Sequence, residues 1–265
     1  MSGSELVRGE PYKDVAYKIA IRRPSKLNAM TSKMWEALAA EVRRGCESQL
    51  PAVVIEGTET AFSSGDDIEE MFKLGSQEAS REFFDKVYAA FRSVLECRKP
   101  VVCVVRGFAT GGGAELLLAC DVVIAEEGSW ISFPEAALGL LPPLLITLGQ
   151  LALGRRRALY LAMTGQRVSA EEAKRLGIVD EVVPSGELER HLDDLLMTVS
   201  SFPSRALAAI KEVSLKVLDD AATRAAVEEL SRLALTEEAK ERMSLFLQRK
   251  FKPAAISRRV DCSGH

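Results

Sequence analysis

The chain has 265 residues, of which 47% are hydrophobic and 28% are charged, and its formal net charge at pH 7 is −3. This balance is ordinary for a globular protein, and the length allows one large domain with a helical addition. Because no long run of one charge sign is present, no nucleic-acid partner is indicated, and two histidines are too few for a His-based metal site.

The first half of the chain alternates between strand and helix patterns. Over residues 15–21 apolar side chains occupy every second position, which is the period of a half-buried strand. Apolar side chains recur at helical spacing over 35–42 and again over 84–95. Such alternation indicates α/β crossover units. Further strands, rich in valine and isoleucine, are predicted at 52–55, 101–105, 121–125 and 178–183.

The last third of the chain is predicted to be mainly helical. Residues 169–172 form a capping box that begins a short helix, and Gly177 is well placed to end it. Beyond Pro203, helical patterns continue to about residue 250 with no strand signal. We therefore expect a core over residues 1–200 and a helical region over 201–265 that packs as a separate layer.

The sequence favours a cytoplasmic location. The apolar run 138–153 is interrupted by glycine and paired prolines, so we expect no membrane span. The first twelve residues lack the apolar core of a secretory signal. The five cysteines have no C-x-x-C spacing, and three lie in apolar stretches. We expect them to be reduced, mostly buried thiols rather than disulfides or zinc ligands.

Two turns combine small residues with a following helix. The first is residues 61–71, AFSSGDDIEEM, and the second is residues 107–116, GFATGGGAEL. Free backbone N–H groups at such helix starts favour negative charge. The three consecutive glycines 111–113 let the backbone approach a ligand oxygen closely, although a tight helix–sheet contact explains them equally well.

Other motifs built on glycine do not fit the spacing. Leu116 stands where the third glycine of a dinucleotide-binding turn belongs, and no Gly-Lys-Ser/Thr follows as a P-loop requires. Ser63 and Ser64 lack the G-x-S-x-G context of a hydrolase nucleophile, and no histidine is placed as their base.

The order of these motifs resembles that of the crotonase, or enoyl-CoA hydratase/isomerase, superfamily. The resemblance implies an α/β fold, a spiral of ββα units with a C-terminal helical region that mediates trimers, often paired as hexamers. It also implies an acyl-CoA substrate, a place in fatty acid metabolism, and no metal or redox cofactor, since coenzyme A is part of the substrate. The matching segments are 23–30 (RPSKLNAM), the two turns, 133–135 (FPE), 138–139 (LG), 164–167 (TGQR) and 173–179 (AKRLGIV).

The resemblance also assigns site residues. The backbone N–H groups of Ser64 and Gly112 would form an oxyanion hole for the thioester oxygen, where the loss of one donor typically costs on the order of 100–1,000-fold in rate. Lys250 and Lys252 resemble basic residues that reach the CoA phosphates, with plain solvent exposure an equal alternative. The coenzyme A groove would be lined by Lys26, Ala29, Ser64, Gly65, Asp66, Asp67, Ile68, Gly111 and Gly112.

Two glutamates match the catalytic pair of enoyl-CoA hydratases. These are Glu115 and Glu135, whereas the family's isomerases usually keep only the second. One would act as base toward water that attacks the β-carbon, and the other would help deliver a proton to the α-carbon. Such a pair would titrate together and share one proton at neutral pH. We therefore expect reversible hydration of a 2-enoyl-CoA to a 3-hydroxyacyl-CoA through a thioester enolate.

One departure from the family keeps other functions open. After Pro142 many hydratases carry a glycine-rich stretch, one of whose N–H groups helps to hold the catalytic water. Here Pro143 has no N–H to donate, and Leu144 and Leu145 follow. Some relatives, including methylglutaconyl-CoA hydratases, lack the stretch and still hydrate. The alternatives are an enoyl-CoA isomerase or other enolate enzyme that uses mainly Glu135, and a non-catalytic CoA-binding subunit.

Overall fold

The computed structural model of the protein describes residues 3–250. Its centre is a six-stranded sheet with the strand order β1-β2-β3-β4-β6-β9. The first two strands are antiparallel, and the other neighbouring pairs are parallel. The strands are β1 (Val7–Tyr12), β2 (Ala16–Ile21), β3 (Val53–Glu56), β4 (Val101–Val105), β6 (Val122–Glu126) and β9 (Glu181–Val183).

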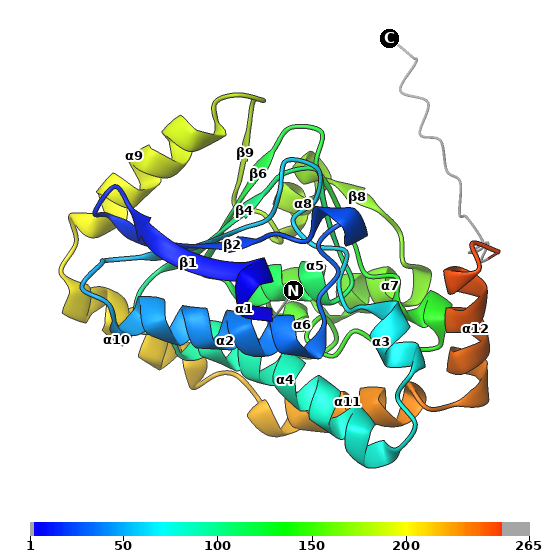
Figure 1. Ribbon diagram of the computed structural model, residues 1–265. Coiled ribbons are helices and arrows are strands. Elements are labelled where there is room, and N and C mark those ends of the chain that lie inside the picture. Colours follow the sequence, from blue (N-terminus) through cyan, green and yellow to red (C-terminus); the bar gives the residue numbers. More distant parts are fainter. Residues whose placement is uncertain (1–2, 251–265) are drawn as a thin grey trace, which may run out of the picture.

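Helices cover both faces of this sheet (Figure 1). On one face α2 and α4 lie side by side, and on the other face α9 packs through buried leucines. The helices are α1 (Gly3–Leu6), α2 (Ser32–Glu47), α3 (Ile68–Phe72), α4 (Gln77–Glu96), α5 (Gly112–Ala119), α6 (Gly149–Leu153), α7 (Arg155–Thr164), α8 (Ala170–Leu176), α9 (Leu188–Ser200), α10 (Ser204–Leu215), α11 (Asp220–Leu233) and α12 (Glu237–Leu247). Two short 3₁₀ helices span Pro24–Lys26 and Glu135–Leu138.

Strand side chains alternate between two apolar cores. Ile55 and Cys103 belong to the core that includes α2 and α4, whereas their neighbours Val54 and Val102 belong to the core with α9. Because both faces are covered, β3 and β4 consist of unbroken apolar runs, as is usual for buried parallel strands. This is why their valine-rich sequences could be recognised.

A second sheet of three strands lies next to the two glycine-containing turns. It consists of β5 (Phe108–Thr110), β7 (Trp130–Ser132) and β8 (Val168–Ser169), in the order β5-β7-β8. Ser63 of the first turn forms a parallel bridge with Ala109 of β5. The small sheet thus brings the first turn beside the second.

The structure confirms most of the predicted elements. The strands β2, β3, β4 and β6 and the helices α2 and α4 lie where the apolar patterns indicated. The Ser169 hydroxyl caps α8 by accepting from the Glu172 N–H at 3.2 Å, and Gly177 ends that helix in the left-handed conformation. The strands β1, β5, β7 and β8 were not predicted, because they are short or carry few apolar residues.

The C-terminal part of the described chain is helical, as expected. No strand follows β9 within residues 3–250, and α10, α11 and α12 pack against the rest of the molecule. The Ser80 hydroxyl of α4 donates to the Ser231 carbonyl of α11 at 2.7 Å, and the Lys240 ammonium of α12 donates to the Leu74 carbonyl at 2.7 Å. Within the same residues, no helix is long and apolar enough to cross a membrane.

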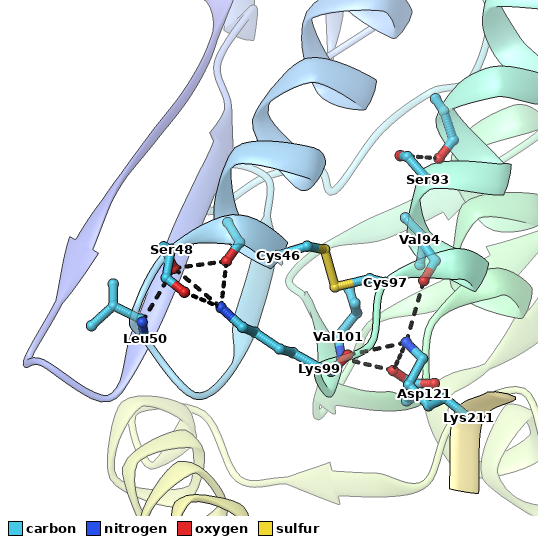
Figure 2. The surroundings of a disulfide bond; sticks show 12 residues. Cys46, Ser48, Leu50, Ser93, Val94, Cys97, Lys99, Val101, Asp121 and Lys211 are labelled. Atoms are coloured by element: carbon cyan, nitrogen blue, oxygen red, sulfur yellow. Dashed lines mark hydrogen bonds and ion pairs between the residues drawn. A yellow bond between two sulfur atoms is a disulfide. The ribbon is translucent and has the colours of Figure 1, made fainter. Parts of the chain in front are cut away.

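The prediction that all cysteines are reduced is wrong for one pair. Cys46 near the end of α2 and Cys97 at the end of α4 form a disulfide, with their Cα atoms 5.6 Å apart (Figure 2). A separation of 51 residues gave no sign that these two helices end side by side. Cys103 and Cys120 are free thiols, and Cys262 lies outside the described residues.

The Lys99 ammonium also ties these two helix ends together. It donates to the backbone carbonyls of Ser48 at 2.5 Å and Gly45 at 3.1 Å, so the segment after α4 is joined to the end of α2 (Figure 2).

Candidate active site

Hydrogen bonds from the segment 23–30 fix the first turn. The Asn28 side chain is fully buried, and its amide donates to the carbonyls of Ala61 at 2.8 Å and Phe62 at 3.2 Å. Its oxygen accepts from the Arg23 N–H at 2.7 Å. This arrangement satisfies every hydrogen-bonding group of a buried amide, which otherwise destabilises a fold. Asn28 therefore holds two distant segments in one position.

The same contacts decide which amides of the first turn are free. The Ser64 N–H donates to the Leu27 carbonyl at 3.0 Å, and the Gly65 N–H donates to the Ser63 hydroxyl at 3.1 Å. The Asp67 N–H donates to the Met30 carbonyl at 2.8 Å.

Between these bonded groups, the Asp66 N–H has no acceptor within residues 3–250. The prediction that Ser64 supplies the free amide is therefore wrong. Asp66, two residues further along the turn, has the free N–H.

The second turn also presents a free amide. The Gly111 N–H donates to the Ser132 carbonyl at 3.1 Å, whereas no described residue accepts from the Gly112 N–H. A Cβ added to Gly65 would lie 2.9 Å from the Gly112 nitrogen. The two turns are therefore in direct contact, and their free amides come from adjacent backbone at residues 66 and 112. Two such donors can stabilise an oxyanion.

The three consecutive glycines have different roles. Gly111 has a φ of 57°, which favours glycine, and it precedes α5. A Cβ on Gly112 would lie 3.3 Å from both a carboxylate oxygen of Asp66 and the Trp35 ring. A Cβ on Gly113 would lie 2.7 Å from the Ser63 side chain. Gly113 thus serves close packing, while Gly111 and Gly112 shape the site.

Glu115 lies on the first turn of α5 and is 3% exposed. Its Oε1 atom accepts from the backbone N–H groups of Leu144 at 2.6 Å and Leu145 at 3.0 Å. Burial and the nearby charge of Glu135 raise the pKa of Glu115 well above its ordinary value, while the two N–H donors lower it. The two donors therefore offset only part of the effect of burial on Glu115.

Glu135 begins the second 3₁₀ helix and faces the second turn. Both of its carboxyl oxygens are buried, and neither has a hydrogen-bond partner among the described residues. Its Oε1 atom lies 3.7 Å from the point where a Cβ on Gly111 would be. Burial, together with the charge of Asp66, raises the pKa of Glu135 to about 8. At neutral pH this carboxyl group therefore carries a proton.

The remaining predicted groove residues lie around the first turn. Asp67 forms an ion pair with Arg23 at 2.5 Å and caps α3, which begins at Ile68. The carbonyl of Ala29 accepts from the same guanidinium at 2.9 Å. Lys26 is exposed and pairs with Glu69 at 3.4 Å.

Lys250 is exposed, and Lys252 lies outside the described residues. Within residues 3–250, no three or more His, Cys, Asp or Glu side chains are arranged to hold a metal ion.

Sequence reasoning missed several groups of the site. Trp35 was placed only in a helix, yet its indole N–H donates to the Asp66 carboxyl at 2.8 Å. The backbone donors of Leu144 and Leu145 were also missed, because a main-chain contact leaves no side-chain signature. Arg23 and Asn28 belong to the matching segment 23–30, which gave a signal for their importance but none for their contacts.

The chain is similar to known proteins over most of its length. The family model described as enoyl-CoA hydratase/isomerase matches residues 12–252. The chain is 30% identical over 240 residues to "Probable enoyl-CoA hydratase echA8" of Mycobacterium bovis, covering 88% of this chain and 91% of the relative. It is 32% identical to "Probable enoyl-CoA hydratase, mitochondrial" of Dictyostelium discoideum, covering 73% of this chain and 70% of the relative.

A solved structure has the same fold. The crystal structure of an enoyl-CoA hydratase from Mycobacterium avium subsp. paratuberculosis K-10 matches with a TM-score of 0.82 at 27% sequence identity. The match covers 93% of this chain and 97% of that chain. The α/β fold predicted for this protein, with its C-terminal helical region, is therefore confirmed.

Proposed function

Because this chain belongs to the enoyl-CoA hydratase/isomerase family, we propose that it catalyses the reversible hydration of a 2-enoyl-CoA to a 3-hydroxyacyl-CoA. The observation that carries the proposal is a pair of buried, interacting carboxyl groups, Glu115 and Glu135, beside two free backbone amides. A reaction that adds water across a double bond needs both a base and an acid, and this pair supplies them.

The two amides support stabilisation of an enolate. The thioester oxygen would accept from the N–H groups of Asp66 and Gly112, which have no acceptor among the described residues. As negative charge develops on that oxygen, these preorganised donors lower the barrier. The donor in the first turn is thus Asp66 in place of Ser64.

The different surroundings of the two glutamates support separate roles. Glu115, whose Oε1 atom is oriented by two backbone donors, acts in its ionised form and takes a proton from water as the water oxygen bonds to the β-carbon. Glu135 transfers its proton to the α-carbon as the enolate collapses. One C–O bond and one C–H bond form and the conjugated double bond is lost. Dehydration reverses each step.

The segment after Pro142 supports a modified way of holding the water. Pro143 has no N–H, and the amides of Leu144 and Leu145 already bind Glu115. We therefore assign the water to the two carboxyl groups themselves. No metal or redox cofactor takes part in this proposal, since coenzyme A enters as part of the substrate, and activity should survive treatment with a chelator.

The direct test is turnover of crotonyl-CoA. Purified protein should remove the ultraviolet absorbance of the conjugated enoyl thioester and give 3-hydroxybutyryl-CoA. Robust binding of the ester without any loss of absorbance would exclude hydration and favour a non-catalytic CoA-binding subunit.

A second candidate is an enoyl-CoA isomerase that uses mainly Glu135. It is favoured by one observation, namely that the Oε1 atom of Glu115 is already held by two amides. Incubation with a 3-enoyl-CoA separates the two activities, because an isomerase forms the 2-enoyl-CoA from it and a hydratase alone does not.

Assembly and location complete the proposal. We infer a trimer or hexamer, supported by exposed apolar side chains on α10, among them Ile210 and Val213, which are 66% and 61% exposed. Light scattering on the purified protein tests this assembly.

A cytoplasmic location rests on the sequence. The Dictyostelium relative is named mitochondrial and disulfides are unusual in a reducing cytoplasm, so fractionation of the source cells is the test.

A further inference from the structure

The position of the Glu135 carboxyl group depends on the short helix that carries it. Both of its oxygens are buried and have no hydrogen-bond partner among the described residues, whereas the Oε1 atom of Glu115 is oriented by two backbone donors. The 3₁₀ helix of Glu135 spans only four residues, and a helix of this length has little stability of its own. Contacts from the rest of the fold therefore hold Glu135 in the site.

The helix α12 supplies such contacts. It packs against α3 (Figure 1) and also against the 3₁₀ helix of Glu135. The guanidinium of Arg242 donates to the carbonyl of Ala137 at 3.2 Å, and Ala137 lies two residues after Glu135. At the end of the 3₁₀ helix, Gly139 lies so close to α12 that a Cβ on it would be 3.3 Å from the Cα atom of the buried Ala239. These contacts fix the 3₁₀ helix against α12.

The same helix also holds the segment that carries the Asp66 amide. The Lys240 ammonium donates to the carbonyls of Met71 at 3.0 Å, Phe72 at 2.7 Å and Leu74 at 2.7 Å. These carbonyls lie at the end of α3, where a lysine side chain can bind the last carbonyl groups of a helix and its charge is favourable. Because α3 follows the first turn directly, Lys240 fixes the far end of that segment.

We propose that α12 fixes the two halves of the site relative to each other, and that Arg242 is the positioning residue for the acid Glu135. This inference rests on the proposed function, in which Glu135 transfers its proton to the α-carbon. Because side chains two residues apart on a helix point to different sides, Lys240 reaches α3 while Arg242 reaches the 3₁₀ helix. Without Arg242 the 3₁₀ helix can move while the first turn stays in place, so the acid moves away from the α-carbon and the oxyanion donors remain.

The test compares Arg242→Ala with the parent protein. The kcat for crotonyl-CoA should fall on the order of 10- to 100-fold, because a small displacement of a reacting group lowers the rate steeply. The KM should change by less than about twofold, because the first turn still binds the ester. Arg242→Lys keeps a donor on a similar stem and should recover part of the lost kcat. A residue that only stabilises the fold would not divide its effect between kcat and KM in this way.

The control separates this contact from an ion pair of the same side chain. The Nε atom of Arg242 lies 3.1 Å from a carboxylate oxygen of Glu238, whose side chain is 69% exposed. Glu238→Gln removes this ion pair and leaves the bond to Ala137, so its kcat should equal that of the parent. Urea unfolding of each variant gives the folded fraction to which each kcat is referred.

A second readout does not depend on turnover. The backbone N–H groups of Ala137, Gly139 and Leu140 donate to carbonyls within residues 134–136. Their hydrogen exchange, followed by mass spectrometry on a peptide that covers residues 134–141, should be faster in Arg242→Ala than in the parent or in Glu238→Gln. Unchanged exchange, or an unchanged kcat in a protein that hydrates crotonyl-CoA, would overturn the inference. Faster exchange in a protein without hydratase activity would instead reject the proposed function and keep the contact of Arg242 with the 3₁₀ helix.

Discussion

Gly113 lies against Ser63 so closely that a Cβ added to it would be 2.7 Å from the Ser63 Cβ. This contact joins the helix that carries Glu115 to the turn that carries the Asp66 amide. The first turn and α5 can therefore approach this closely only because residue 113 has no side chain.

The first prediction follows from this contact. Gly113→Ala should lower the free energy of unfolding by roughly 1–3 kcal/mol, because extra volume in a packed interface forces the backbone apart. It should also reduce kcat/KM, since the free amides would move relative to each other. Gly75→Ala is the matched control, because no atom lies within 4 Å of the added Cβ. Urea unfolding and crotonyl-CoA kinetics on both variants make the comparison. Equal behaviour of the two would contradict the role given to this contact.

The second prediction concerns the two glutamates. Glu115→Gln and Glu135→Gln should each lower kcat by several orders of magnitude while CoA esters still bind, because each removes one proton-transfer group. In the parent, hydration should decline as pH rises through about 8, where Glu135 loses its proton. Full activity in either variant would refute the assignment. Calorimetric titration with a saturated acyl-CoA checks that binding is kept.

The third prediction concerns stability and pH. The pKa of Glu135 is 4.5 in an unfolded chain and about 8 in the folded protein, so the folded protein binds more protons between these values. The free energy of unfolding should therefore fall as pH rises from about 4.5 to 8.

Glutamine at position 135 removes that dependence. At pH 8 Glu135→Gln should be more stable than the parent by on the order of a few kcal/mol, and near pH 4.5 the two should be similar. Urea unfolding of both proteins at several pH values measures the difference. A constant difference across the range would show that Glu135 does not titrate in this way.

The fourth prediction concerns the disulfide. Replacement of Cys46 and Cys97 by serine should lower the free energy of unfolding by about 3–4 kcal/mol, the value expected for a closed loop of this length. A reducing agent should have the same effect on the parent and no effect on the double variant. Cys120→Ser, which alters a free thiol, is the control. If the parent is insensitive to the reducing agent, the bond does not contribute to stability.

The sequence allowed the family and five of the six strands of the main sheet to be predicted, because each depends on a local pattern. Buried parallel strands such as β4 have an unbroken apolar composition. The spacing of Glu115 and Glu135 from the glycines drew attention to both, and their catalytic roles remain a prediction. The free N–H of Asp66 could not be identified in the same way. An amide of a turn is free only when no carbonyl from another segment lies within reach of it. The Ser64 N–H is not free, because it donates to the Leu27 carbonyl.

The other features that the sequence did not predict depend on contacts between segments far apart in the chain. The Cys46–Cys97 bond depends on two long helices ending side by side. The hydrogen bond from Trp35 to Asp66 joins residues that are 31 apart in the sequence. Such long-range geometry leaves no periodic trace in a single chain.

Because of the buried Asn28, the candidate site forms only when the surrounding core is folded. It joins the segment 23–30 to the first turn, and Ser63 bridges that turn to β5, so the pocket is assembled from three stretches far apart in sequence. None of these stretches can adopt its working conformation by itself. Inactivation by heat or denaturant should thus coincide with cooperative unfolding of the core rather than precede it, and turnover becomes a sensitive reporter of the native population.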